Sequence, residues 1–161
     1  VYEEGLPLVF FYEYFLMGKQ KMATRHGNII PISTLLKILE REVILFIYTK
    51  RPRKQRNLNL LNAPNWTNEF DRAERIYFGK IKARNEKEKF VLSRNYKLAY
   101  LYNPPKTLPE RISYSRCIKI IKNIPDNSWE SFINKTKFNN KDKKRLELAR
   151  YWLKNYSQKY I

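Results

Sequence analysis

Apolar residues recur at helical spacing through much of the chain, and this periodicity restricts the fold more than any other feature of the sequence. It is found in residues 113–122, 129–137 and 140–156, and in a fourth stretch that begins at Trp66. Ser113 or Ser115 is expected to begin the first of these helices, and Ser128 to cap the second. In each stretch the apolar residues fall on one face of a helix and charged residues fall on the other. Because such a helix must bury its apolar face against another element, we predict an α-helical bundle over residues 61–161.

The helix predicted from Trp66 has charged residues on its outer face, where Asp71 and Arg75 are expected to pair with each other. We expect this helix to continue to Ile81, weakened in its last turns by Gly79.

Residues 84–102 mix charged and apolar residues and are assigned to a further helix. Asn103-Pro104-Pro105, together with Pro109, forms a rigid connector and is the best candidate for a boundary within the chain.

The N-terminal part has a different pattern. Residues 2–17 are dense in strand-forming residues and predict a buried strand. Ser33 is the predicted N-cap of a short helix that follows Pro31. Residues 42–48 are apolar nearly all round, so they fit a buried helix or a buried strand, and periodicity does not decide between them. The predicted fold is therefore mainly α, with a small α/β region in residues 1–60 before the bundle.

The chain is strongly basic, with 33 Lys and Arg against 15 Asp and Glu and a formal net charge of +18. Repulsion at this charge destabilises a free monomer, and binding to a polyanion relieves it. Nucleic acid is the expected polyanion. A membrane partner is disfavoured, because no basic helix has the clean apolar face of a membrane-surface helix and the apolar run at residues 6–15 is too short to cross a bilayer.

The residue types exclude several kinds of site. With one cysteine, Cys117, and one histidine, His26, the chain cannot form an internal disulfide or a Cys/His metal site. Cys117 falls on an apolar stripe, where we expect a small buried side chain in a protein of the reducing cytoplasm. No paired carboxylates, nucleophile triad or P-loop is recognisable. We therefore expect a protein that is not an enzyme and takes no cofactor and no small-molecule substrate.

Cations gather in three parts of the chain, and we predict that they contact RNA phosphates. The first part is the loop that starts at Gly18. The second is residues 50–56, with five cations in seven residues and a proline that prevents a regular helix, although an ordinary solvated loop remains the alternative. The third is residues 111–161, which carry half of the excess charge. The candidate RNA-contacting residues are Lys19, Lys21, Arg25, His26, Lys50, Arg51, Arg53, Lys54, Arg56, Arg116, Lys119, Lys135, Lys137, Lys141, Lys143, Lys144 and Arg145.

The last predicted helix has cations in its first turn, namely Lys141, Lys143, Lys144 and Arg145. Positive charge has the wrong sign for a helix N-terminus, so an external anion is expected there.

Four aromatic side chains are expected to be available for stacking on bases, namely Trp66, Tyr100, Tyr102 and Tyr160, while most others are assigned to the core.

The loop at residues 18–31 resembles the signature loop of class I aminoacyl-tRNA synthetases. It keeps Lys21-Met22 and Gly27-Asn28, but Ala23-Thr24-Arg25-His26 stands where that family has serines and a lysine. The resemblance implies a loop whose backbone N–H groups and lysines hold a triphosphate. The changes imply that this loop is degenerate.

A larger resemblance covers almost the whole chain, which is similar to the C-terminal third of an archaeal-type class I lysyl-tRNA synthetase. The matching segments are residues 12–16, 21–22, 27–30, 48–52, 69–79, 111–114 and 149–153. This resemblance implies a stem-contact region with a degenerate signature loop in residues 1–60, followed by an anticodon-binding α-helical bundle in residues 61–161.

The resemblance also implies what is missing. The ATP site of the family needs a nucleotide-binding sheet with a His-x-Gly-His/Asn motif, N-terminal to the matched region, and His26 is the single histidine of this chain. We therefore expect that the chain alone does not aminoacylate tRNA.

Three functions stay open. The leading hypothesis is a non-enzymatic RNA-binding protein derived from the synthetase, a ribosomal or ribosome-associated cytoplasmic protein that binds rRNA beside neighbouring ribosomal proteins. The alternative is a tRNA-binding fragment or trans-acting subunit of a class I lysyl-tRNA synthetase. The third is a protein-interaction module or degraded remnant, and this hypothesis does not explain the net charge of +18.

Overall fold

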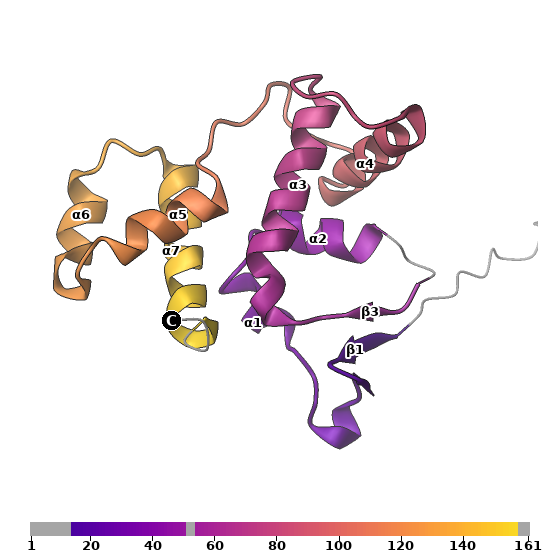
Figure 1. Cartoon of the computed structure of the whole chain (residues 1–161), viewed down its shortest axis with the longest axis horizontal. Coiled ribbons are helices and arrows are strands. Elements are labelled where there is room, and N and C mark those ends of the chain that lie inside the picture. The colour runs from indigo at the N-terminus through magenta and orange to yellow at the C-terminus, as the bar shows by residue number, and fades with distance from the viewer. Residues whose placement is uncertain (1–13, 51–53, 158–161) are drawn as a thin grey trace, which may run out of the picture.

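The computed structural model describes residues 14–50 and 54–157, and helices dominate this part of the chain (Figure 1). The helices are α1 (Ile32–Leu36), α2 (Arg41–Thr49), α3 (Ala63–Tyr77), α4 (Glu86–Ala99), α5 (Tyr114–Lys122), α6 (Trp129–Lys135) and α7 (Asn140–Tyr156), with short 3-10 turns η1 (Thr24–His26), η2 (Leu60–Asn62) and η3 (Asp126–Ser128). A small sheet consists of β1 (Phe15–Met17), β2 (Gln20–Lys21) and β3 (Arg56–Asn57). The predicted mainly α fold with a small α/β region is confirmed.

The sheet has the strand order β2-β1-β3. β1 and β2 are antiparallel and are joined by a turn in which Gly18 has a left-handed φ of 66°. β3 runs parallel to β1, with Phe15 opposite Arg56. The side chain of Asn57 accepts a hydrogen bond from the Gly18 N–H (3.2 Å) and donates one to the Gly18 carbonyl (2.8 Å). The sheet therefore ties the turn at Gly18 to the segment that follows α2.

Several predicted elements agree with the structure. α7 spans the residues predicted for the last helix, and α5 begins after Ser113, whose hydroxyl accepts a hydrogen bond from the Arg116 N–H (3.3 Å). Residues 42–48 lie within α2 and are helical. The strand predicted for residues 2–17 can be compared only from residue 14 on, where β1 covers Phe15–Met17. The predicted burial is wrong for this part, because Phe15 and Leu16 are half-buried and Met17 is exposed.

Two predicted capping serines do not cap. α1 begins directly after Pro31, and Ser33 lies inside the helix. Ser128 stands at the N-cap position of α6, but its hydroxyl donates to the side chain of Asn127 (3.2 Å) and makes no capping bond.

α3 ends at Tyr77 and not at Ile81. Gly79 has a φ of 67°, and the Lys80 N–H donates to the Arg75 carbonyl (2.8 Å), which is the hydrogen bond that closes a Schellman motif. Glycine adopts this left-handed φ without steric cost, so it ends the helix rather than weakening it.

α4 ends in the same motif without a glycine. The Tyr102 N–H donates to the Lys97 carbonyl (2.8 Å) and the Leu101 N–H to the Leu98 carbonyl (2.9 Å). Leu101 has a φ of 51° and Tyr102 a φ of 64°. A left-handed conformation costs an ordinary L-residue roughly 1–2 kcal/mol, so this turn is held against a local preference.

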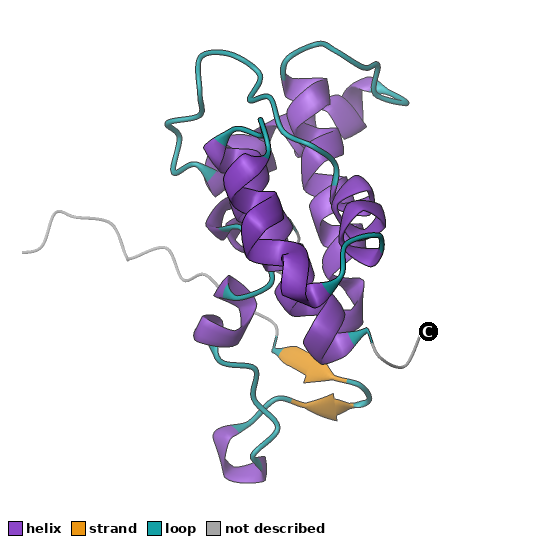
Figure 2. Ribbon diagram, turned by 90° about the vertical axis from the view of Figure 1, so that its left-hand side faces the viewer, coloured by secondary structure: helices purple, strands orange, loops and turns teal. Residues whose placement is uncertain are grey.

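The helices form two groups that share one core. α3 packs against α2 and α4, and α5 packs against α7 (Figure 1). Figure 2 shows the small sheet at one end of this helical body. Leu39, Phe46, Phe70, Tyr114 and Trp152, which come from both groups, belong to one buried apolar cluster. The division of the chain into domains at residue 60 stays a prediction.

Cys117 is fully buried in α5, as predicted. Burial raises the pKa of its thiol to about 12. The thiol is therefore protonated at neutral pH and acts as a small apolar side chain.

A buried guanidinium joins the two groups of helices. Arg145 of α7 is 1% exposed and donates to both carboxylate oxygens of Glu40 (3.0 and 2.7 Å) and both of Asp71 (2.8 and 2.9 Å). It also donates to the Ile112 carbonyl (3.0 Å). These five bonds use all five N–H groups of the guanidinium. The predicted pair of Asp71 with Arg75 is wrong, because Asp71 faces inward and Arg75 is exposed.

Arg111 extends this arrangement from the segment before α5. It pairs with Glu74 of α3, lies 3.8 Å from Glu40, and covers the ring of Phe70 at 5.3 Å. The hydroxyl of Tyr96, from α4, donates to the second oxygen of Glu74 (2.8 Å). We call Glu40, Asp71, Glu74, Arg111 and Arg145 the buried ion cluster.

Arg145 keeps its positive charge in the folded protein. Burial alone would lower the pKa of Arg145, but the hydrogen bonds and charges of Glu40 and Asp71 outweigh it and raise that pKa. Burying ions is unfavourable unless each is paired and hydrogen-bonded, and here each is.

We expect Arg145→Ala to lower the free energy of unfolding by about 3–5 kcal/mol, because it leaves two buried carboxylates without their partner. Arg145→Lys keeps the charge but cannot make five bonds, so an intermediate loss is expected. Urea unfolding followed by circular dichroism measures both.

The matched control is Lys144→Ala, which removes an exposed cation next to Arg145 and should change stability by less than about 0.5 kcal/mol. Equal stability of the Arg145→Ala and Lys144→Ala proteins would show that the buried ion cluster contributes nothing.

Candidate nucleic-acid interface

One buried side chain folds the loop at residues 18–28. Asn28 is 8% exposed, and its side-chain oxygen accepts a hydrogen bond from the Ala23 N–H (2.9 Å). Its side-chain nitrogen donates to the Lys21 carbonyl (2.9 Å). The amide of Asn28 therefore holds the opposite side of the loop at two adjacent points.

The residues that this loop shares with the synthetase signature are largely those that fold it. Gly27, with a φ of 64°, makes the turn before Asn28. Met22 packs its side chain against the core and donates its N–H to the Phe15 carbonyl (2.8 Å). Residues 23–26, where the sequence departs from the signature, form the tip of the loop and include η1.

The loop presents cations to solvent. Lys19, Lys21 and Arg25 are exposed, and the Lys21 ammonium lies 4.5 Å from the centroid of the Tyr14 ring. An open pocket of about 490 Å³ is lined by Gln20, Lys21, Ala23, Arg25 and Asn28. Two cations on its wall suit it to an anion such as a phosphate. The side chain of His26 lies outside the described part of the structure.

Within residues 50–56, Arg56 has a structural role. Its guanidinium donates to the carbonyls of Ile47 and Tyr48, the latter at 3.0 Å, and lies 5.6 Å from the centroid of the Phe15 ring. These bonds satisfy carbonyl groups at the C-terminal end of α2. The predicted RNA contact of Arg56 is therefore corrected, because the side chain joins α2 to the sheet.

Lys50 pairs with Glu69 of α3, so its charge is balanced inside the protein. Lys54 is exposed and stays a candidate. Arg51 and Arg53 lie outside the described residues.

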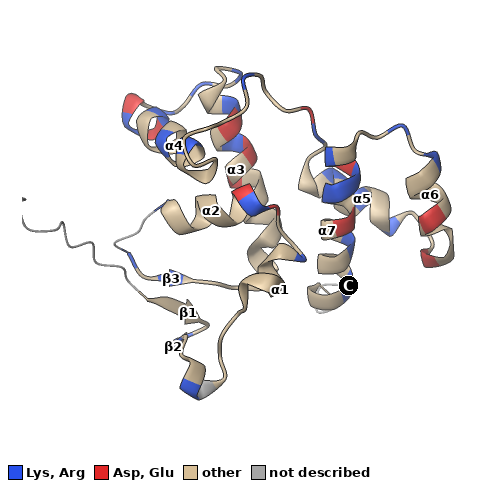
Figure 3. Cartoon of the chain, turned by 180° about the vertical axis from the view of Figure 1, so that it is seen from behind, with Lys and Arg blue, Asp and Glu red and all other residues tan. Residues whose placement is uncertain are grey.

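The candidates of the C-terminal helices are mostly exposed. Those exposed are Arg116, Lys119, Lys135, Lys137, Lys141 and Lys144, and Lys143 is half-buried. Figure 3 shows Lys and Arg on α5 and on the first turns of α7. The prediction that Arg145 contacts RNA is wrong, because this side chain is buried and all its donors are used.

The N-terminus of α7 does not lack negative charge. Asn139 accepts the Asp142 N–H (2.9 Å), and the buried carboxylate of Asp142, in the first turn, accepts the Ile112 N–H (2.7 Å). The negative charge of Asp142 interacts favourably with the positive end of the helix dipole. The argument that this helix end requires an external anion is therefore wrong.

The aromatic candidates differ in exposure. Trp66 and Tyr100 are half-buried, and the Tyr100 ring lies 5.1 Å from that of Tyr96. Burial raises the pKa of the Tyr100 hydroxyl. Tyr102 is exposed, and Tyr160 is outside the described residues.

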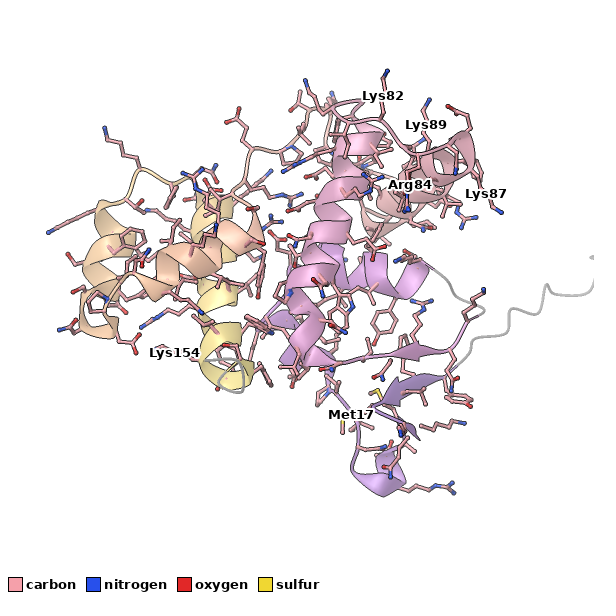
Figure 4. The ribbon with its side chains drawn as sticks, viewed as in Figure 1. Met17, Lys82, Arg84, Lys87, Lys89 and Lys154 are labelled. Atoms are coloured by element: carbon pink, nitrogen blue, oxygen red, sulfur yellow. The ribbon has the colours of Figure 1, made fainter. Side chains whose placement is uncertain are left out.

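The sequence analysis missed a further cationic surface, at the corner between α3 and α4. Residues 80–97 contain seven Lys and Arg. Side chains that extend from this corner are Lys82, Arg84, Lys87 and Lys89 (Figure 4). The hydrogen bond from Arg84, supported by Arg72, lowers the pKa of Glu88 to about 2. The density of cations could have revealed the surface, but Glu86 and Glu88 interrupt it.

The exposed cations thus lie on separate parts of the molecule (Figure 3). We call them the loop cluster (Lys19, Lys21, Arg25), the α5–α7 cluster (Arg116, Lys119, Lys141, Lys144) and the α3–α4 corner (Lys82, Arg84, Lys87, Lys89).

Neither a membrane-spanning helix nor a metal-binding group of side chains is found in the part of the chain that the structure describes. None of its helices has the length and apolar character needed to cross a bilayer. Residues 14–50 and 54–157 also hold no group of three His, Cys, Asp or Glu side chains arranged to bind a metal ion.

Comparison with known proteins gives a consistent set of relatives. The family model described as "tRNA synthetases class I (K)" matches residues 1–101. The lysine–tRNA ligase of Thermococcus kodakarensis is 34% identical, over 94% of this chain and 31% of that protein. That of Pyrococcus furiosus is 33% identical, over 100% of this chain and 33% of that protein. The lysine–tRNA ligase of Borreliella burgdorferi is 23% identical, over 98% of this chain and 32% of that protein. The chain spans about a third of the length of these relatives.

We expect Asn28→Ala to loosen the loop without unfolding the protein, because two backbone groups lose their partner at a local cost of about 1–3 kcal/mol. Hydrogen exchange at residues 18–28 should become faster, most clearly at the Ala23 amide. Gln20→Ala changes an exposed side chain of the same loop and serves as the control. Unchanged exchange in the Asn28→Ala protein would contradict the role of Asn28.

Proposed function

The chain belongs to the class I lysyl-tRNA synthetase family, and on that basis we propose that it binds transfer RNA as a non-catalytic RNA-binding unit. Its relatives are named as lysine–tRNA ligases, so tRNA is the RNA that their name specifies. We further propose that the chain does not join lysine to tRNA by itself, because its single histidine cannot supply the family's histidine motif.

The observation that carries this proposal is that the loop keeps the residues that fold it but not the signature residues at its tip. Asn28, Gly27 and Met22 still fold it, while residues 23–26 at its tip lack the serines and the lysine of the signature. Lys21 and Arg25 beside the pocket remain suited to an RNA phosphate. Such a loop supports anion binding without the reaction at the triphosphate of ATP.

The charge distribution supports the same function. Four carboxylates are buried, at Glu40, Asp71, Glu74 and Asp142. The first three pair with the guanidiniums of Arg111 and Arg145, and Asp142 accepts the Ile112 N–H. The remaining surface is therefore more cationic than the formal net charge of +18 indicates. A phosphate backbone neutralises such a surface and gains affinity from the release of its counterions.

A second candidate is a cytoplasmic ribosome-associated protein that binds ribosomal RNA beside other ribosomal proteins. The observation that favours it is the spread of the cations: the loop cluster, the α5–α7 cluster and the α3–α4 corner lie at separate ends of the molecule (Figure 3). A protein embedded in a large RNA meets phosphates on several sides, whereas one tRNA approaches from fewer directions.

For the α5–α7 cluster we expect Lys141→Gln with Lys144→Gln to weaken tRNA binding at moderate salt. The slope of log affinity against log salt should fall by about 0.7–0.9 for each phosphate contact that is lost. Filter binding across a salt series measures it.

The matched control is Lys50→Gln with Lys154→Gln, which removes the same charge from lysines that already pair with Glu69 and Asp126. Equal slopes in the two double variants would contradict RNA contact at the α5–α7 cluster.

Sedimentation of cell extract through a sucrose gradient separates the two candidates. With tRNA as the partner, we expect the protein near the top of the gradient, with tRNA recovered when it is captured. Sedimentation with one ribosomal subunit after a high-salt wash would favour the rRNA candidate and overturn the tRNA proposal.

A further inference from the structure

α4 and the turn that follows it place large apolar side chains in solvent. Phe90 and Leu101 are each 66% exposed and Tyr102 is 68% exposed, more than any other large apolar residue that the structure describes. Phe90 lies on the helix and Tyr102 in the turn that follows it. Single exposed apolar residues are common, but Phe90 and Tyr102 line one pocket and together form a patch.

The turn holds this patch against its own backbone preference. α3 closes its Schellman motif with Gly79, whereas α4 closes the same motif with Leu101 and Tyr102, both at left-handed φ. The hydrogen bonds to the Leu98 and Lys97 carbonyls fix Leu101 and Tyr102 in this conformation. The position of Tyr102 beside α4 is therefore set by the backbone.

Phe90 and Tyr102 line a shared pocket of about 430 Å³. Its wall also carries Lys89, Arg94 and Lys97. The guanidinium of Arg94 lies 6.0 Å from the centroid of the Phe90 ring. Glu86, the one carboxylate on this wall, lies 3.7 Å from the ammonium of Lys89, which leaves the pocket with a positive balance.

The surroundings of the pocket have the same charge. Figure 4 shows Lys82, Lys87 and Lys89 extending into solvent around the α3–α4 corner. An apolar pocket enclosed by cations is complementary to a ligand that has a flat apolar face and negative groups close to it. A nucleotide combines both, because its base stacks on aromatic rings while its phosphates meet lysine and arginine.

Resting on the proposed RNA-binding function, we propose that Phe90 and Tyr102 bind the base of an unpaired nucleotide, with the neighbouring phosphates on Lys89, Arg94 and Lys97. The nucleotide must be unpaired, because in a duplex both faces of a base are covered by its stacked neighbours. The pocket thus selects single-stranded segments, whereas the loop cluster and the α5–α7 cluster contact phosphates of any RNA.

The test compares two probes on the full chain, a short oligouridylate and an RNA duplex with the same number of phosphates. Phe90→Ala with Tyr102→Ala should weaken oligouridylate binding by about 25-fold or more, since each lost stack removes a factor of about five or more. Duplex binding should change by less than about twofold. The salt slope for the oligouridylate should not change, because no phosphate contact is removed.

Tyr151→Ala is the matched control, since it removes an exposed tyrosine of α7. Phe90→Tyr with Tyr102→Phe keeps both rings and should retain oligouridylate binding. Thermal unfolding confirms that each variant is folded. As a second readout, oligouridylate that contains 4-thiouridine should cross-link to a peptide with Phe90 or Tyr102.

The outcomes are separable. Failure of the unsubstituted protein to bind tRNA or either probe overturns the proposed function itself. Normal tRNA and duplex binding, with oligouridylate binding unchanged in the double alanine variant, overturns the base pocket alone and leaves the patch to a protein partner. An equal loss of affinity for the duplex and the oligouridylate in the double alanine variant also overturns the base pocket, because the two side chains would then not act by stacking on an unpaired base.

Discussion

A guanidinium without access to water determines how this chain packs. Arg145 makes five hydrogen bonds, and they reach Glu40 at the start of α2, Asp71 in α3 and the carbonyl of Ile112 before α5. Each of these ions would be costly to bury alone, so the positions of α2, α3 and α7 are coupled. Apolar packing alone tolerates small shifts between helices, whereas a bidentate pair fixes distance and direction.

The same cluster explains the character of the surface. It withdraws carboxylates from solvent, so the chain can be stabilised by internal ion pairs and still present an excess of cations. The segments that carry the family resemblance also supply residues of the buried ion cluster. Residues 69–79 contain Asp71 and Glu74, and residues 111–114 contain Arg111. In the loop, Asn28 and Gly27 likewise have a structural role. The family likeness of this chain therefore resides largely in the residues that hold its fold together.

Helix positions could be predicted from the sequence, because periodicity and capping are local. The apolar stripes in residues 113–122 and 140–156 placed α5 and α7 correctly. The partners of charged residues could not be predicted in this way. Asp71 and Arg145 are 74 residues apart, so nothing in the local pattern distinguishes them from solvated charges. Arg56 was misassigned for the same reason, because its acceptors are carbonyl groups that no sequence pattern reveals. The aromatic pocket needed the fold as well, since Phe90 and Tyr102 line one pocket only because α4 ends in a left-handed turn.

The sequence distance within the buried ion cluster also has a consequence for synthesis. Glu40 and Arg145 are separated by 105 residues, so three carboxylates of the cluster leave the ribosome well before the guanidinium that lies between two of them. Unpaired carboxylates stay hydrated, and until Arg145 is available they keep α2 and α3 from closing over their shared core. Final packing is then a late step governed by non-local contacts, which are slow to form. A nascent chain that has not yet reached Arg145 therefore lacks the ion that joins α2, α3 and α7.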